Sequence, residues 1–223
     1  MTQAFNDLVA KIHQGVNPYT DFPVADWMSE NPHVWDSQHE WFNKMIDDLK
    51  PHTIIEVGSF KGGSAIHMAQ HLKELGLDAA IVCVDTWLSD RILWLDPAWR
   101  PHLHIAHGRP EYYNVFMRNV IEAGLTDYIV PLPMPSLAAA RFLFRLDISA
   151  QLVYVDGSHE RGDAYLDIQN YYDNLLDKGG VMLVDDIDFS NPMFEGLICD
   201  LTQFVVERHM TFSVLGRKAL IKK

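Results

Sequence analysis

Apolar residues recur along the chain in two different rhythms, and the change between them divides the sequence. In the first part, apolar residues such as Phe5, Leu8 and Ile12 are three or four positions apart, which predicts an amphipathic helix. A second stretch with this spacing spans residues 35–49 and predicts another helix. We therefore expect residues 1–50 to form an N-terminal helical cap.

Short apolar runs alternate with amphipathic stretches through the rest of the chain, residues 51–223. The runs predict strands near residues 53–58, 79–85, 128–132, 151–156 and 180–185. The stretches predict helices near residues 62–75, 110–123, 136–144, 161–177 and 192–208. The last residues predict two short strands in a hairpin around Gly216. This alternation predicts an α/β fold: a seven-stranded, mostly parallel sheet with helices on both faces and an antiparallel last strand.

The longest stretch without a helix or strand pattern spans residues 86–110. A loop of that length inside a compact domain is usually a lid or a binding element. It contains Trp87, Trp94 and Trp99 and ends close to Tyr112. These aromatic side chains could stack against a substrate ring or simply pack in the core.

The bulk composition excludes several classes of partner. A net charge of −12 over 223 residues argues against binding to nucleic acid or to an anionic membrane. We interpret the basic residues near the C-terminus as a solvated chain end: Arg217, Lys218, Lys222 and Lys223. Cys83 and Cys199 form no spaced motif, so we expect buried free thiols in a reducing compartment. There is no apolar run of membrane-spanning length, and we expect a cytoplasmic protein.

A glycine-rich turn follows the first predicted strand in the stretch "TIIEVGSFKGGSA". Gly58, Gly62 and Gly63 let the backbone turn tightly and approach a ligand closely. Their spacing departs from the Gly-x-Gly-x-x-Gly fingerprint of dinucleotide sites, and there is no phosphate-binding Gly-Lys-Ser/Thr run. The second strand ends at Asp85, an acid placed to accept hydrogen bonds from both hydroxyls of a ribose.

Acidic residues follow two further predicted strands. Asp156 ends one apolar run, and Asp185 with Asp186 ends the next. The helix predicted between these runs makes the two strands parallel, so that their carboxyl ends share one edge of the sheet. Carboxylates are hard ligands that suit Mg²⁺, Mn²⁺ or Ca²⁺, and Asp188 lies close enough in sequence to add to them. The alternative is that these acids only cap the following helix and turn.

Three short motifs resemble one enzyme family. "EVGSFKGGSA" (residues 56–65), "VDTW" (residues 84–87) and "DGSH" (residues 156–159) resemble motifs of class I S-adenosylmethionine-dependent methyltransferases. The similarity is to their metal-dependent O-methyltransferase branch, which includes catechol O-methyltransferase and the sugar O-methyltransferases of macrolide and aminocoumarin pathways. It covers roughly residues 50–190 and implies a Rossmann-like fold.

The resemblance assigns roles to individual residues. It implies a cofactor site made of Glu56, Gly58, Phe60, Gly62, Ser64, Asp85, Ser136 and Asp156. It implies a metal site made of Asp156, Asp185 and Asp186. The catalytic base would be His159, which stands where catechol-type enzymes have a lysine. Members of this family are often dimers, so the resemblance implies a homodimer or a higher homo-oligomer, with the N-terminal helices as a candidate interface.

The function expected from these patterns is Mg²⁺-dependent transfer of a methyl group from S-adenosylmethionine to a hydroxyl of a small molecule, such as a sugar or another natural product. Three acids so close together should repel one another when no cation is bound. An NAD-type oxidoreductase on a similar sheet and a non-catalytic cofactor-binding protein are the alternatives. His102, His104 and His107 could in addition ligate zinc or be ordinary surface residues.

Overall fold

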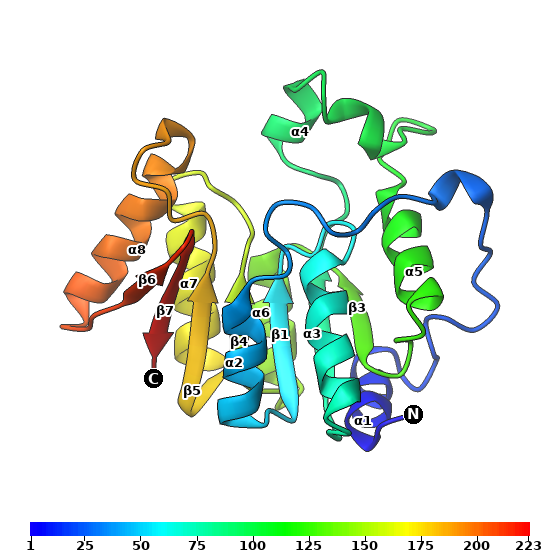
Figure 1. The fold of residues 1–223 in the computed structure, drawn as a ribbon, viewed down its shortest axis with the longest axis horizontal. Helices are drawn as coiled ribbons and strands as arrows, with labels where there is room; N and C mark the ends of the chain where they lie inside the picture. Colours follow the sequence, from blue (N-terminus) through cyan, green and yellow to red (C-terminus); the bar gives the residue numbers. More distant parts are fainter.

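The computed structural model describes every residue from Met1 to Lys223 and shows one seven-stranded sheet between two layers of helices (Figure 1). The strands are β1 (Thr53–Val57), β2 (Ala80–Asp85), β3 (Ile129–Pro133), β4 (Ala150–Val155), β5 (Leu176–Val184), β6 (Ser213–Leu215) and β7 (Lys218–Lys222). The α-helices are α1 (Gln3–Ile12), α2 (Glu40–Leu49), α3 (Gly63–Glu74), α4 (Arg91–Leu95), α5 (Tyr112–Glu122), α6 (Ser136–Arg145), α7 (Asp163–Asn174) and α8 (Glu195–Glu207). Three short 3₁₀ turns complete the chain: η1 (Asp26–Met28), η2 (Arg100–Leu103) and η3 (Pro192–Phe194).

The strand order is β3-β2-β1-β4-β5-β7-β6. The first five strands of this order run parallel, and β7 is antiparallel to both β5 and β6. This arrangement confirms the predicted fold class. From β1 the chain continues to β2 and β3 on one side of the sheet and then returns to β4 on the other. A crevice at the carboxyl ends of β1 and β4 is therefore expected, because ligands of open α/β sheets bind at such a switch point.

The helices cover the sheet on both faces. Ile55 and Val57 of β1 belong to a core shared with α1, α6, α7 and α8. Ile54, which points to the opposite face, belongs to a second core shared with α2, α3 and α5. Continuous burial of the central strands explains why their sequences are apolar runs without alternation. The two N-terminal helices thus contribute to opposite faces of the sheet.

Some element boundaries differ from the sequence predictions. The predicted helix 35–49 begins only at Glu40, because the imidazole of His39 accepts from the backbone N–H of Trp41 at 3.2 Å and caps the helix there. Trp35 instead lies in a turn with a left-handed φ of 49°. The predicted helix 192–208 is divided into η3 and α8, and the side chain of Asn191 caps the first of these.

The lid residues 86–110 are more ordered than an irregular loop, since they contain α4 and η2. Glu30 from the N-terminal segment anchors this lid. Its carboxylate accepts hydrogen bonds from His102, at 2.8 Å, and from His104, and it pairs with the buried ammonium of Lys61. Burial acts to raise the pKa of Glu30, but the hydrogen bonds from Lys61, His104 and His102 outweigh it and lower that pKa. The three histidines 102, 104 and 107 do not gather as a set of zinc ligands.

Glu30→Gln should loosen the lid and lower stability. The side chain of Lys61 is only 2% exposed, and removing its partner charge leaves the ammonium buried and unpaired. We expect a loss of about 2 kcal/mol in the free energy of unfolding, together with faster proteolysis within residues 86–110. Urea denaturation and limited trypsin digestion measure these two effects. Asp48→Asn, which removes an exposed pair with Lys44, is the matched control and should change neither.

Candidate active site

Four neighbouring strands end at the same level of the sheet and place their next residues side by side. Val57 of β1 pairs in register with Val84 of β2 and with Val155 of β4, and Val155 pairs with Val184 of β5. The residues that follow these four valines are Gly58, Asp85, Asp156 and Asp185. The turn and the acids that the sequence predicts at one edge are therefore brought together by strand register alone.

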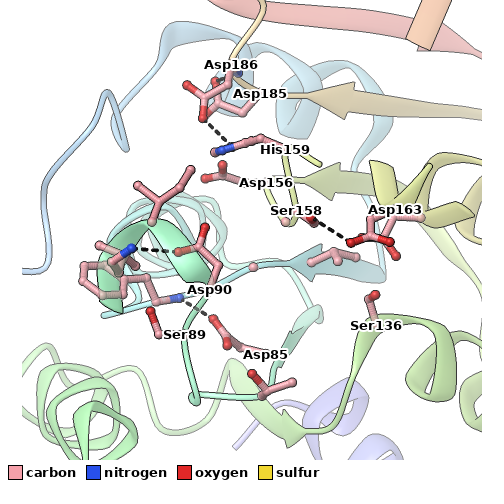
Figure 2. Close-up of a pocket in the computed structure, with 18 of the residues that line it drawn as sticks. Asp85, Ser89, Asp90, Ser136, Asp156, Ser158, His159, Asp163, Asp185 and Asp186 are labelled. Atoms are coloured by element: carbon pink, nitrogen blue, oxygen red, sulfur yellow. Dashed lines mark hydrogen bonds and ion pairs between the residues drawn. The ribbon is translucent and has the colours of Figure 1, made fainter. Parts of the chain in front are cut away.

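A cavity of about 600 Å³ lies over these strand ends (Figure 2). Its floor includes Gly58, Asp85 and Asp156, and residues of the lid and the η3 region form its walls. Figure 2 shows Asp156, His159, Asp185 and Asp186 at one end of the cavity and Asp85 toward the other. Thirteen of the thirty lining residues are hydrophobic, so by residue type the cavity is more polar than most small-molecule sites.

Gly58 makes the close contact between the first turn and β4. Its φ is +85°, and a Cβ atom built on it would lie 1.8 Å from the carbonyl oxygen of Asp156. Only glycine satisfies both the left-handed backbone and this approach. Gly62 also has a left-handed φ and precedes α3 directly. The turn is thereby held flat against the strand ends, which leaves the space above it open as the cavity.

Asp85 shapes the same turn from β2. Its carboxylate accepts hydrogen bonds from the backbone N–H groups of Ser59 at 3.0 Å, Phe60 at 2.9 Å and Trp87 at 2.7 Å. Burial raises the pKa of Asp85, and these hydrogen bonds work against the rise. The side chain also lines the cavity. It therefore supports the turn and presents a hydrogen-bond acceptor to any ligand that lies over it.

Glu56 lies beneath the turn and is fully buried. Its carboxylate accepts hydrogen bonds from the hydroxyls of Ser59, at 2.5 Å, and of Ser64. Burial raises its pKa to about 7, and the serine hydrogen bonds oppose that rise. Three of the predicted cofactor residues, Glu56, Gly62 and Ser64, are not among those that line the cavity, whereas Gly58, Phe60, Asp85, Ser136 and Asp156 are.

Glu56 should make the stability of the protein depend on pH. The pKa of this carboxyl is about 7 in the folded protein and 4.5 in its unperturbed state, so that between these values the folded protein binds more protons than the unfolded chain. Stability should therefore fall by about 3 kcal/mol as pH rises through this interval. In Glu56→Gln this part of the decline should be absent. Urea denaturation of both proteins across that pH range measures the difference, and identical pH profiles would contradict it.

Asp156, His159 and Asp186 form a compact cluster at the acidic end of the cavity. One ligand atom from each lies within 4.8 Å of the others, and Nε2 of His159 is 2.8 Å from Oδ2 of Asp186. Nδ1 of His159 is buried and has no hydrogen-bond partner. Burial raises the pKa of Asp156 well above its usual value, and repulsion from Asp185 and Asp186 adds to the rise. The positive charge of Lys218 acts against this rise.

Two cations at the start of β7, Arg217 and Lys218, reach the acids at this end of the cavity, and the sequence analysis was wrong about both. The ammonium of Lys218 is fully buried and donates to Asp185 at 2.7 Å, and Arg217 pairs with Asp186. The hydroxyl of Tyr154 also donates to Asp185. Arg217 and Lys218 are not part of a solvated chain end, because antiparallel pairing of β7 with β5 places the start of β7 beside the carboxyl end of β5.

The donor atoms at this end fit a hard divalent cation. The carboxylates of Asp156 and Asp186 lie close together, and carboxylate oxygens are the ligands that such an ion prefers. A cation between them would offset the repulsion that acts on Asp156. Asp185 lines the same cavity but holds Lys218, so it could ligate an ion only by exchanging that contact. Asp186 would likewise have to exchange a contact, because one of its oxygens faces Arg217 and the other faces His159. Asp188, considered above as an additional ligand, is not part of the cluster.

The aromatic residues considered in the lid differ in their surroundings: one lies in the core and others line the cavity. Trp87 is 2% exposed and packs between Tyr113 and Phe116, so it belongs to the core. Trp99 lines the cavity, as does Tyr112. Trp35 also lines it, which the sequence analysis missed because it placed this residue in a helix. Its place after the Pro32-containing loop was the only hint in the sequence.

The chain matches two family models. It matches the one described as a methyltransferase domain over residues 55–187, which is more than half of the chain. The model of rhamnosyl O-methyltransferase/CmcI matches residues 15–93. No curated protein sequence matches the chain significantly.

Solved structures share this fold at low sequence identity. The calicheamicin methyltransferase CalS11 is 18% identical, with a TM-score of 0.59 and coverage of 82% of this chain and 76% of its own. An O-methyltransferase from Bacillus cereus in complex with SAH is 13% identical, with a TM-score of 0.61 and coverage of 99% and 97%. The O-methyltransferase TomG from Streptomyces achromogenes, in complex with SAM, is 15% identical, with a TM-score of 0.59 and coverage of 100% and 91%.

Proposed function

The chain belongs to the methyltransferase domain family, and from this premise we propose that it transfers a methyl group from S-adenosylmethionine to a hydroxyl of a small molecule, such as a sugar or another natural product, with Mg²⁺ as its metal ion. The supporting observation is one cavity that joins Asp85 and the glycine turn to the cluster of Asp156, His159 and Asp186. The first part suits a ribose-bearing donor, and the second suits a hydroxyl that must lose a proton.

The donor would lie over the strand ends. Asp85 would accept hydrogen bonds from its ribose hydroxyls, while Gly58 and Phe60 would surround its methionine part. Ser136, at the start of α6, would border the adenine. The two serine-bonded oxygens of Glu56 would keep the turn in place from below without touching the ligand.

Asp156 and Asp186 would hold the metal ion, with Asp185 as the third candidate ligand. When bound, Mg²⁺ would supply positive charge that acidifies and positions the acceptor hydroxyl. His159 would accept the hydroxyl proton, and the carboxylate of Asp186, which lies 2.8 Å from Nε2, would stabilise the imidazolium that forms. Arg217 would keep that carboxylate oriented. Much of the rate should then come from holding the two reactants in line.

Transfer of a radiolabelled methyl group tests this proposal. The protein is incubated with S-adenosylmethionine labelled on its methyl group and with a panel of monosaccharides, amino sugars and phenols, with Mg²⁺ or with a chelator. Labelled product should form with Mg²⁺ and be lost with the chelator or in Asp186→Asn. Product formation that is unaffected by the chelator would contradict the role of the metal ion.

The thermal stability of metal-stripped protein provides a test of the metal site that needs no acceptor. Mg²⁺ should raise the melting temperature in a concentration-dependent way, because it binds the folded state and relieves repulsion at Asp156. Asp186→Asn should abolish most of this rise. A melting temperature that does not change across millimolar Mg²⁺ would contradict metal binding at this cluster.

A further inference from the structure

We propose that Trp35 and Trp99 form the acceptor subsite of the cavity and that the acceptor is a hydroxylated ring compound with a positive charge, of the amino-sugar type. This inference rests on the proposed function, because it assigns the substrate class of the same cavity. Two observations support it: an aromatic pair in the wall of the cavity, and the distribution of charged side chains around that pair.

The two tryptophans come from segments far apart in the sequence. Their ring centroids are 4.2 Å apart, and the ring of Trp35 also stacks on Phe60 at 5.0 Å. Both tryptophans line the cavity, and Trp35 as a whole residue remains 48% exposed. A large aromatic surface that stays open to a cavity offers a stacking face for a sugar ring or a cation.

The segment that carries Trp35 is fixed in place. Trp35 and Asp36 both adopt left-handed φ values, of 49° and 61°, which are rare for residues with bulky side chains. On either side, the carbonyl of Pro32 and the side chain of Ser37 lie so close to Gly63 that a Cβ atom there would be 2.3 Å and 2.9 Å from them. The start of α3 therefore holds the turn, and the turn holds the ring over the cavity.

The charge of the cavity selects the kind of acceptor. Eight of its thirty lining residues are aspartates, and Arg217, already paired with Asp186, is its one arginine or lysine. Three of these aspartates lie away from the metal-ligand cluster: Asp90 and Asp96 in the lid, and Asp163 at the start of α7. Figure 2 shows Asp90 and Asp163. A bound metal ion would neutralise the cluster but leave these three charges in place.

Asp96 is the carboxylate best placed to act with the aromatic pair. It lies in the same turn as Trp99, whose backbone N–H donates to the carbonyl of Asp96 at 3.2 Å. One of its carboxylate oxygens accepts from the N–H of Ala98 at 2.8 Å, and the residue forms no ion pair. An ammonium group above the tryptophans would find both a ring face and a negative charge, whereas a phosphate would be repelled.

Three matched sugars test the proposal in protein saturated with S-adenosylhomocysteine and Mg²⁺. The probes are D-glucosamine, D-glucose and D-glucose 6-phosphate, titrated at a pH where the amine is protonated, with affinities measured by saturation-transfer NMR. We expect glucosamine to bind about tenfold more tightly than glucose and the phosphate to bind most weakly. The preference for the amine should shrink at high salt.

Variants separate the aromatic from the charge contribution. Trp35→Leu and Trp99→Leu should weaken glucosamine binding, while Trp27→Leu, a tryptophan of the same segment that is 46% exposed and lies outside the cavity, should not. Asp96→Asn keeps an oxygen for the N–H of Ala98 and removes the charge, so it should reduce the preference for glucosamine over glucose.

These measurements either support or overturn the proposed acceptor class. Equal or tighter binding of glucose 6-phosphate, equal glucosamine affinity in all three tryptophan variants, or no glucosamine binding at millimolar concentrations would overturn the proposal. Binding of S-adenosylhomocysteine is measured first in the same samples, so its failure would count against the proposed function separately. In that case the sugars are titrated into the ligand-free protein, where the same order of affinities is expected.

Discussion

Gly58→Ala should cost about 4 kcal/mol of folding free energy and abolish binding of the methyl donor. The new Cβ would lie 1.8 Å from the carbonyl oxygen of Asp156, which is backbone and cannot rotate away. The φ of +85° adds strain for any residue with a side chain. The first turn would have to separate from β4, and the hydrogen bonds from Ser59 and Phe60 to Asp85 would be lost with it. Urea denaturation measures the loss.

Gly76→Ala is the matched control for this prediction. Gly76 has a φ of +65°, and a Cβ atom there would have no neighbour within 4 Å. The Gly76→Ala variant should therefore lose only about 1 kcal/mol of folding free energy, which is the cost of a left-handed φ for alanine. Equal losses at the two positions would mean that the approach to Asp156 does not matter for stability.

His159→Ala should lower kcat by about 10³-fold while leaving the affinity for S-adenosylhomocysteine nearly unchanged. The imidazole lies 2.8 Å from Asp186, at the end of the cavity away from Asp85, so its loss removes the base but not the donor site. Steady-state kinetics on an acceptor identified in the methyl-transfer assay measures the effect.

His159→Asn sharpens this test, because an amide could still donate to Asp186 but could not act as a base. It should be as inactive as the alanine variant, whereas His107→Ala, at an exposed lid position, should retain activity. Activity in His159→Asn close to that of the wild type would show that the residue only positions Asp186.

The sequence predicts the central part of the site because that part depends on strand ends. Parallel strands in register place the residues after Val57, Val84 and Val155 together, and apolar runs mark those strands clearly. The glycine turn can also be predicted from neighbouring residues alone, because the positive φ at position 58 favours glycine. These features need no knowledge of distant contacts.

The parts that the sequence does not predict depend on contacts between distant segments. Lys218 enters the acidic cluster because β7 pairs with β5 in one particular antiparallel register, and a short basic stretch gives no sign of that register. Trp35 fits a helical spacing, but the cap at His39 and the packing of its segment against Gly63 override this local pattern. The lid is ordered by Glu30, more than seventy residues away from His102 and His104.

Isothermal titration of metal-stripped protein with S-adenosylhomocysteine tests the central claim most directly. The account predicts micromolar binding, no binding of NAD in a parallel titration, and a separate heat on adding Mg²⁺ that Asp186→Asn removes. Asp85→Asn should weaken binding of S-adenosylhomocysteine, because one carboxylate oxygen that would accept from the ribose becomes a donor. Binding of NAD in preference to S-adenosylhomocysteine, or no binding of the latter, would contradict methyl transfer in this cavity.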